Sequence, residues 1–124
     1  MGAVSVFFDT YALFEVLKKN PEYSRFVNDV AVITTRLNLM ELYYGLLTKH
    51  GEEVAESAYS GFLPHVVDID DDTIKEAMKF KASARTRALS YVDCVGYALA
   101  RRLNIKFLTG DRQFKEMPSV QWVK

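Results

Sequence analysis

The sequence predicts an α/β protein, namely a three-layer α/β/α sandwich with a mainly parallel central sheet. Three observations support this prediction. Strand-like runs alternate with helical patterns along the chain, which is typical of βαβ units. The strand-like runs are continuously apolar, as expected for strands that helices cover on both faces. The length of 124 residues leaves room for one core, so we expect a single domain over residues 1–124.

The first third of the chain contains two strand patterns, each followed by helical patterns. Residues 4–8 form an apolar run, and apolar side chains at helical spacing follow over residues 11–18. A short second helix is expected over residues 22–29, after a proline that ends the first helix. The next strand covers residues 31–35 and leads into a long helix over residues 36–49.

The helix over residues 36–49 is apolar on nearly all sides, which predicts burial on more than one side. We expect one stripe to face the core, formed by Leu37, Met40, Tyr44 and Leu47. Glu41 lies in the sector of this stripe, where a carboxylate is unfavourable unless it is paired or bound, although a long side chain at the edge can reach water. The other apolar side would then be an oligomer or partner surface. Its residues are Leu39, Leu42, Tyr43 and Leu46.

The remaining elements alternate in the same way. Helices are expected over residues 52–61, from Thr73 onward, and over 91–102, and short strands over 65–67, 105–108 and 119–123. The acidic run at residues 68–72 lacks the glycine and glutamate of an EF-hand loop and favours the amino end of the helix from Thr73. Ser90 and Asp93 match a capping box, and Val92, Val95, Leu99 and Leu103 form the expected core face of the last helix.

The composition limits how the protein can hold a charged ligand. Sixteen basic and sixteen acidic side chains cancel, so a polyanion would have to be held by local charges or by bound cations. The single cysteine, Cys94, cannot form an internal disulfide, which suits a reducing compartment. Neither a membrane-spanning apolar run nor a signal segment is evident in the sequence. We therefore expect a cytoplasmic protein without a membrane partner.

Four acidic residues are predicted to converge. Asp9 and Asp111 each follow a strand, and the carboxyl ends of parallel strands lie at one edge of the sheet, where α/β proteins bind ligands. Asp93, near a helix start, and Glu41, one turn into another helix, can reach the same crevice. Helix capping is the alternative interpretation for Asp9 and for Asp93.

Carboxylates that lie close together repel one another, by roughly 1–4 kcal/mol for each pair at ~4 Å. They must therefore take up protons or bind cations. Oxygen ligands without a nearby His or Cys suit Mg²⁺ or Mn²⁺ better than Zn²⁺. One or two such ions can activate water and stabilise charge on a phosphodiester, which predicts hydrolysis of a phosphate ester bond.

Four short motifs, in this order, resemble the pattern of the PIN-domain family, and most closely the VapC-type toxins. They are Phe8-Asp9-Thr10, Asn38-Leu39-Met40-Glu41-Leu42, Ser90-Tyr91-Val92-Asp93-Cys94 and Thr109-Gly110-Asp111-Arg112-Gln113-Phe114. The resemblance implies a PIN-like fold and a metal-dependent endoribonuclease that is neutralised by a paired antitoxin. It also implies that one or two Mg²⁺ or Mn²⁺ ions are held by Asp9, Glu41, Asp93 and Asp111.

The resemblance carries three further implications. Thr109 would lie in the same site and orient a carboxylate or a water molecule. The protein would form a homodimer through its helices, which agrees with the two-sided helix over residues 36–49. An antitoxin segment would cover a groove near the acids.

Three basic residues lie nearest the acids in sequence and are candidates for binding RNA phosphates. They are Arg85, Arg87 and Arg112. The alternative is that these side chains are ordinary solvated charges, as basic residues on helices commonly are.

Other functions with similar acids fit the sequence less well. An aspartyl phosphatase usually needs a second Asp two positions after the first, where this chain has Tyr11. A receiver domain needs another order of acids and a lysine after its last long strand. The alternative from a different class is a PIN-like binding module, whose acidic crevice holds an ion or a basic partner segment without catalysis.

Overall fold

The fold was analysed in a computed structural model that describes residues 4–85 and 87–124; the remainder of the predicted 1–124 domain, residues 1–3 and 86, lies outside the description. The described chain alternates strands and helices, with two short 3₁₀ helices, η1 and η2. The elements are β1 (Val4–Phe8), α1 (Thr10–Leu17), α2 (Pro21–Asp29), β2 (Val30–Ile33), α3 (Arg36–His50), α4 (Glu52–Phe62), η1 (Leu63–His65), α5 (Asp71–Ser83), α6 (Tyr91–Arg102), β3 (Lys106–Thr109), η2 (Arg112–Phe114) and β4 (Val120–Trp122).

The central sheet has four strands in the order β2-β1-β3-β4, and every neighbouring pair is parallel. The prediction of a mainly parallel sheet is therefore confirmed. Phe8 of β1 pairs with Leu108 of β3, so the two strands end side by side. Their carboxyl ends define the edge of the sheet at which the candidate site lies.

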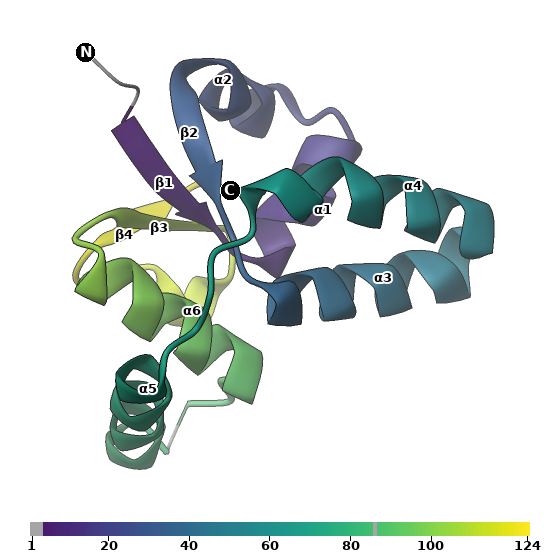
Figure 1. The fold of residues 1–124 in the computed structure, drawn as a ribbon. Coiled ribbons are helices and arrows are strands. Elements are labelled where there is room, and N and C mark those ends of the chain that lie inside the picture. Colours follow the sequence, from purple (N-terminus) through teal and green to yellow (C-terminus); the bar gives the residue numbers. More distant parts are fainter. Residues whose placement is uncertain (1–3, 86) are drawn as a thin grey trace.

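Helices cover both faces of the sheet, which gives the predicted three layers (Figure 1). Successive residues of a strand point to opposite faces. Val6 and Phe8 accordingly pack in a core with residues of α1, α2, α3 and α4, whereas Phe7 packs with residues of α5 and α6. Phe7 stacks on Phe107 of β3 with 5.4 Å between ring centroids. The buried β1 thus joins the two cores.

The predicted core face of α3 is wrong. Met40, Tyr44 and Leu47 are 54%, 70% and 40% exposed. The buried apolar residues are those assigned to the opposite side, Leu39, Leu42 and Leu46. Helical spacing could not distinguish the two sides, because both are apolar. The choice follows from packing: α3 lies along α4, and these three leucines share a core with Ala55 and Ala58 of α4 (Figure 1).

The helices that lead to the second core begin as the sequence predicts. Asp70 caps α5 through the backbone N–H of Thr73, and Asp71 and Asp72 lie in the first turn. Ser90 and Asp93 form the predicted capping box at the start of α6. Gly96 of α6 lies against the sheet, because a Cβ atom there would stand 2.9 Å from a ring carbon of Phe7.

Two smaller predictions are wrong. Residues 65–67 are not a strand, because η1 ends at His65 and only Val66 forms an isolated parallel bridge, to Thr34. Pro64, within η1, fixes its own φ near the helical value and favours this tight turn. Leu103 is 47% exposed rather than part of the core face of α6, since it follows the last residue of that helix.

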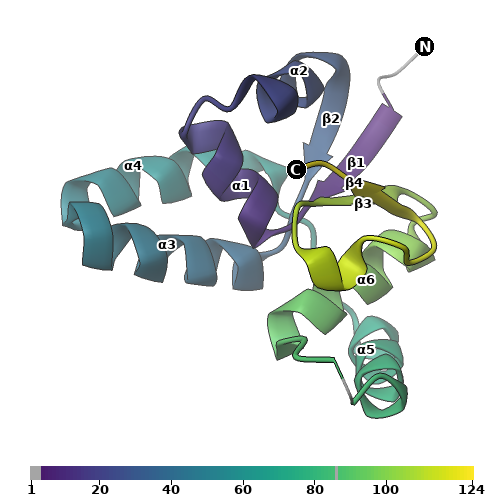
Figure 2. The same ribbon diagram turned by 180° about the vertical axis from the view of Figure 1, so that it is seen from behind.

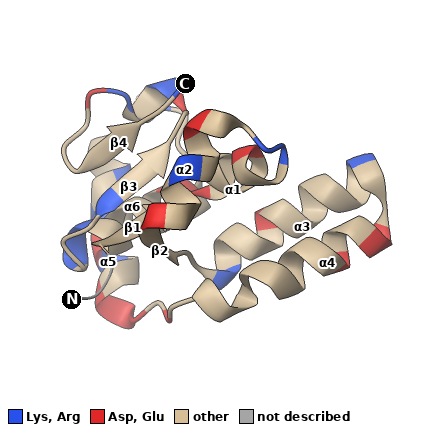
Figure 3. Cartoon of the chain, turned by 90° about the horizontal axis from the view of Figure 1, so that it is seen from above, with Lys and Arg blue, Asp and Glu red and all other residues tan. Residues whose placement is uncertain are grey.

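Basic and acidic side chains are interspersed along the chain, apart from the acidic run that leads into α5 (Figure 3). The large apolar side chains are mostly buried within the two cores rather than gathered along one helix. Among the described residues, no helix combines the length and the apolar character that crossing a bilayer requires.

Candidate active site

The four predicted acids lie at the edge formed by the carboxyl ends of the strands. Asp9 directly follows β1, and Asp111 lies two residues beyond the end of β3. Glu41 is in the second turn of α3, and Asp93 is in the first turn of α6. Figure 2 shows that the starts of α1 and α3 and the segment after β3 come together at this edge.

Asp9 is the most buried of the four, with 3% of its surface exposed. Its Oδ1 atom accepts a hydrogen bond of 2.9 Å from the backbone N–H of Ala12, so Asp9 is the N-cap of α1. The pKa of Asp9 is raised to about 7, chiefly by burial. The Thr109 hydroxyl and the Ala12 N–H lower this pKa, whereas the charges of Asp93 and Asp111 contribute to raising it. Asp9 therefore caps α1 and also belongs to the group of acids, so the two interpretations of this residue do not exclude each other.

Thr109, the last residue of β3, links two of the acids. Thr109 is fully buried, and its hydroxyl acts on the carboxyl group of Asp9 by lowering the pKa of that group. The same oxygen accepts a 3.0 Å hydrogen bond from the backbone N–H of Asp111. Asp111 in turn accepts from the backbone N–H of Gln113 and caps η2. The threonine thus holds the segment after β3 against Asp9.

Glu41 is held by a chain of polar side chains. Thr10 Oγ1 donates to Glu41 Oε1 over 2.6 Å, and Asn38 Nδ2 donates to Thr10 Oγ1 over 3.1 Å. Thr35, the N-cap of α3, donates from Oγ1 to Asn38 Oδ1 over 2.6 Å. Partial burial, with a smaller contribution from the charge of Asp93, raises the pKa of Glu41. The sequence did not indicate Thr10 or Asn38 as site residues. The one feature that could have pointed to them is that each belongs to a motif that also contains one of the acids.

Asp93 is coupled to the other acids and to one basic residue. Burial raises the pKa of its carboxyl group, and the charge of Asp111 adds to this effect. The capping box opposes it, because the backbone N–H of Ser90 donates to Asp93 Oδ2 over 3.0 Å. Lys81 of α5 also lowers the pKa of Asp93. No local pattern in the sequence indicates that Lys81 lies close enough to Asp93 to affect its pKa.

The three predicted arginines do not form one cluster. All three are exposed. Arg87 donates from Nη1 to the backbone oxygen of Gln113 over 2.8 Å and so lies near the segment that carries Asp111. Arg112 follows Asp111 directly in sequence. The side chains of Arg85 and Arg112 take part in none of the hydrogen bonds or ion pairs found among the described residues.

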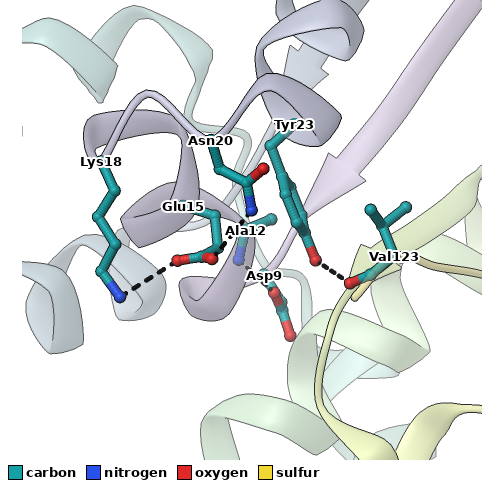
Figure 4. A network of polar contacts seen from close by, with 7 residues as sticks. All are labelled: Asp9, Ala12, Glu15, Lys18, Asn20, Tyr23 and Val123. Atoms are coloured by element: carbon teal, nitrogen blue, oxygen red, sulfur yellow. Dashed lines mark hydrogen bonds and ion pairs between the residues drawn. The ribbon is translucent and has the colours of Figure 1, made fainter.

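The wall of the site beside Asp9 is built by Tyr23 of α2. Its side chain is fully buried, and its hydroxyl donates to the backbone oxygen of Val123 (Figure 4). Burial raises the pKa of Tyr23, as do the charges of Tyr11 and Asp9. The buried Tyr23 side chain therefore lies near Asp9 and remains neutral (Figure 4).

The acids fit a hard divalent cation by their chemistry. All the donors are oxygens, and burial, together with the charges of neighbouring acids, raises the pKa values of Asp9, Glu41 and Asp93, so a bound cation would favour their ionised forms. Within residues 4–85 and 87–124, no three His, Cys, Asp or Glu side chains form a ready-made metal site. Mg²⁺ commonly keeps several water molecules, through which carboxylates that do not reach the ion directly can still contact it.

Comparisons with known proteins agree with this architecture. The model of the PIN domain family matches residues 6–120. Among solved structures, Mycobacterium tuberculosis VapC20, described as a Sarcin-Ricin loop cleaving toxin, is 22% identical, with a TM-score of 0.76 over 93% of this chain and 96% of that chain. A toxin–antitoxin complex from Klebsiella pneumoniae is 19% identical, with a TM-score of 0.74 over 94% and 95% of the two chains.

A third structure, VapBC2 from Rickettsia felis bound to a DNA fragment from their promoter, is 16% identical, with a TM-score of 0.75 over 98% of this chain and 100% of that chain. A search of curated protein sequences found no match. At these identities the solved structures demonstrate a shared fold. The family match is stronger evidence, because it extends from β1 to the first residue of β4. The chain therefore belongs to the PIN domain family.

Proposed function

We propose that this protein is a metal-dependent endoribonuclease that hydrolyses RNA phosphodiester bonds. The observation that supports this most directly is the buried Asp9 carboxyl group, whose pKa of about 7 reflects burial and the nearby charges of Asp93 and Asp111. Glu41 belongs to the same cluster through its coupling to Asp93. Such uncompensated acids at the carboxyl edge of a parallel sheet are suited to binding a cation and a phosphate ester.

The ion in this proposal is Mg²⁺ or Mn²⁺, as one or two ions held by Asp9, Glu41, Asp93 and Asp111. When bound, it supplies an activated water molecule and stabilises negative charge on the phosphate. The residues of the chain keep the ligands in place. Thr109 orients Asp9, and Thr10 orients Glu41 through a hydrogen bond of 2.6 Å. Asp9 has only 3% of its surface exposed, so bulk water has little access to its side chain.

We further propose that Arg112 and Arg87 bind RNA phosphates, because they adjoin the Asp111 segment on its exposed side. Arg85 remains a weaker candidate, since no contact connects it to the acids among the described residues. Neutralising the two nearer arginines should weaken RNA binding and reduce its dependence on salt. The reason is that a protein with fewer phosphate contacts releases fewer counterions from the RNA when it binds. RNA as the substrate also favours the cytoplasm as the working compartment.

The biological role that we propose is that of the toxin in a type II toxin–antitoxin pair. Support comes from the similar solved structures, one of which is described as a toxin–antitoxin complex and another as VapBC2 bound to promoter DNA. Two hollows, of about 650 and 950 Å³, share Phe14 and Lys49 and extend from Glu41 along α1, α3 and α4. The larger is lined mostly by apolar side chains, such as those of Leu46 and Phe62, which suits a segment of an antitoxin.

The test is cleavage of labelled RNA in the presence of Mn²⁺, with Asp9→Asn prepared in parallel. We expect the wild type to cleave and the variant to be at least about 100-fold slower, because it loses a charged ligand of the ion. Titration calorimetry should detect Mn²⁺ binding to the wild type. Equal cleavage by both proteins would indicate a contaminating nuclease. Metal binding without cleavage would favour the alternative, a binding module whose acidic crevice holds an ion or a basic partner segment.

A further inference from the structure

Lys81 on α5 is held in a defined position beside the acids. Its Nζ atom donates a 2.7 Å hydrogen bond to the backbone oxygen of Leu89. The same atom lies 4.8 Å from the centroid of the Tyr91 ring, within the range of a cation–π contact. Both partners belong to the segment that leads into α6 and Asp93. A lysine side chain is flexible by nature, so two contacts on one ammonium group limit where its charge can lie.

The ammonium group of Lys81 retains hydrogen-bonding capacity. It has three donors, and the described contacts use one of them, for Leu89. None of the ion pairs among the described residues includes Lys81. Its charge acts on Asp93 from a distance and lowers the pKa of that carboxyl group. Lys81 is therefore a positioned cation with free donors at the border of an acidic cluster.

Lys79, one of its neighbours on the same helix, provides the contrast. The Lys79 side chain is 77% exposed and forms an ion pair of 3.8 Å with Glu76, one turn earlier. This is the ordinary arrangement of a solvated helix charge. Lys81 is only partly exposed and contacts the loop before α6 instead. The difference shows that Lys81 is not one more residue of a solvated basic face.

We infer that Lys81 binds a phosphate of the RNA strand next to the phosphate that is cleaved. The inference rests on the proposed function, because it names how that site holds its substrate. An RNA backbone that approaches four carboxylates meets repulsion, which a fixed ammonium group at their border offsets. Leu89 and Tyr91 are positioning residues in this arrangement, since they hold the ammonium group and do not touch the phosphate.

The experiment measures binding of a fluorescein-labelled single-stranded RNA by fluorescence anisotropy over a series of KCl concentrations. Every protein carries Asp9→Asn so that the RNA is not cleaved. Lys81→Met should raise Kd by about tenfold, the effect of one charged hydrogen bond. It should also reduce the slope of log K against log salt by about 0.7, the value for one phosphate contact on a single strand. Lys81→Arg should keep the slope, and Lys79→Met should leave both quantities unchanged.

A second measurement separates this inference from the proposed function. With wild-type Asp9 and Mn²⁺, Lys81→Met should raise KM for RNA cleavage more than it lowers kcat. If the parent protein cleaves RNA while Lys81→Met matches Lys79→Met in Kd and salt slope, Lys81 is a structural residue and the inference is overturned. If the parent protein does not cleave but Lys81 still governs the salt slope, the nuclease proposal fails and phosphate binding stands.

Loss of the hydrogen bond to Leu89 can disturb the loop before α6, so folding must be measured as well. Circular dichroism and thermal unfolding of each variant provide this control. If Lys81→Met does not fold, Lys81→Gln serves in its place, because it keeps a hydrogen-bond donor and removes the charge. A normal salt slope in a folded Lys81→Gln protein would equally overturn the inference.

Discussion

The carboxyl group of Asp9 has two oxygens, so it can cap a helix with one of them and still belong to the acidic cluster. Its Oδ1 atom accepts the backbone N–H of Ala12 and caps α1, which ties its position to the end of β1. The carboxyl group also adjoins Thr109 and feels the charges of Asp93 and Asp111. Capping fixes the side chain, and the fixed side chain can then serve as a ligand with little loss of conformational entropy.

The raised pKa of Asp9 predicts that the metal-free protein becomes less stable as the pH rises from about 4 through about 7. The ordinary pKa is 3.8 and the folded value is about 7, so the folded protein binds more protons than the unfolded chain in this window. Glu41 and Asp93 shift in the same direction and act with the same sign. Urea unfolding in EDTA from pH 4.5 to 8.5 measures the effect.

The matched variant is Asp9→Asn, which keeps a favoured N-cap residue and removes the titrating group. It should flatten the pH dependence and be more stable than the wild type at pH 8 by a few kcal/mol at most. An unchanged slope in the variant would show that Asp9 does not titrate in this range.

Metal binding should depend on pH for the same reason. A cation binds the ionised carboxylates, so binding to partly protonated acids must release protons. We expect 1 mM Mn²⁺ to raise the melting temperature more at pH 8 than at pH 6, and to have little effect on Asp9→Asn at either pH. Differential scanning fluorimetry with matched CaCl₂ and KCl controls measures the shift. An equal shift at both pH values would contradict coupled protonation.

Among single residues, the sequence predicted the four acids as candidates because each follows a strand or lies near the start of a helix. It did not identify what holds them. The contact between Thr10 and Glu41 spans 31 positions in the chain. Lys81 acts on Asp93 from another helix. Such contacts depend on how the helices are placed around the sheet, and local sequence patterns do not predict that placement.

At the level of elements, α6 owes its position to Gly96. A Cβ atom there would stand 2.9 Å and 3.0 Å from two ring carbons of Phe7, and 3.3 Å from Phe107. The two rings stack on each other, so neither is free to move away. The small residue therefore lets the helix that carries Asp93 lie directly on the centre of the sheet.

We predict that Gly96→Ala lowers the free energy of unfolding by roughly 1–3 kcal/mol, because an added methyl group overpacks this contact. The control is Gly61→Ala in α4, where nothing lies within 4 Å of the added Cβ atom. Alanine should be neutral there or stabilise by up to about 1 kcal/mol, through its higher helix propensity. Urea denaturation measures both variants. Greater stability of Gly96→Ala than of the wild type would contradict the close packing.

For the whole molecule, the main unpartnered apolar feature of α3 is the exposed side formed by Met40, Tyr44 and Leu47. The sequence-based expectation of a homodimer through the helices remains a proposal, and this side is its natural candidate. It adjoins the hollow that Glu41 and Thr10 line, so a dimer would bring its second copy close to the site. Exposed apolar patches of this kind mark protein contacts.

Light scattering at micromolar concentration should then give about twice the chain mass of 14.2 kDa. Tyr44→Glu and Leu47→Glu should shift the protein toward the monomer, because each puts a charge into the apolar contact. Val27→Glu on α2, at a similarly exposed valine, serves as the control and should leave the mass unchanged. A monomeric wild type would rule out this dimer.

The sequence by itself determined the layered α/β architecture and the order of most elements, and it predicted that the four acids lie toward one edge of the sheet. These follow from local physics: continuous apolar runs make buried strands, helical spacing and caps set helix limits, and parallel strands end at a common edge. Helix α6 begins and ends where the sequence predicts, at Tyr91 and Arg102, because its capping box is local.

Only the tertiary structure decided which side of α3 is buried, how Glu41 is held by Thr10, and that the charge of Lys81 affects Asp93. The physical reason is the same in each case. A helix that is apolar all round, or a flexible charged side chain, has several arrangements of similar local free energy. Packing against elements distant in sequence selects one of them.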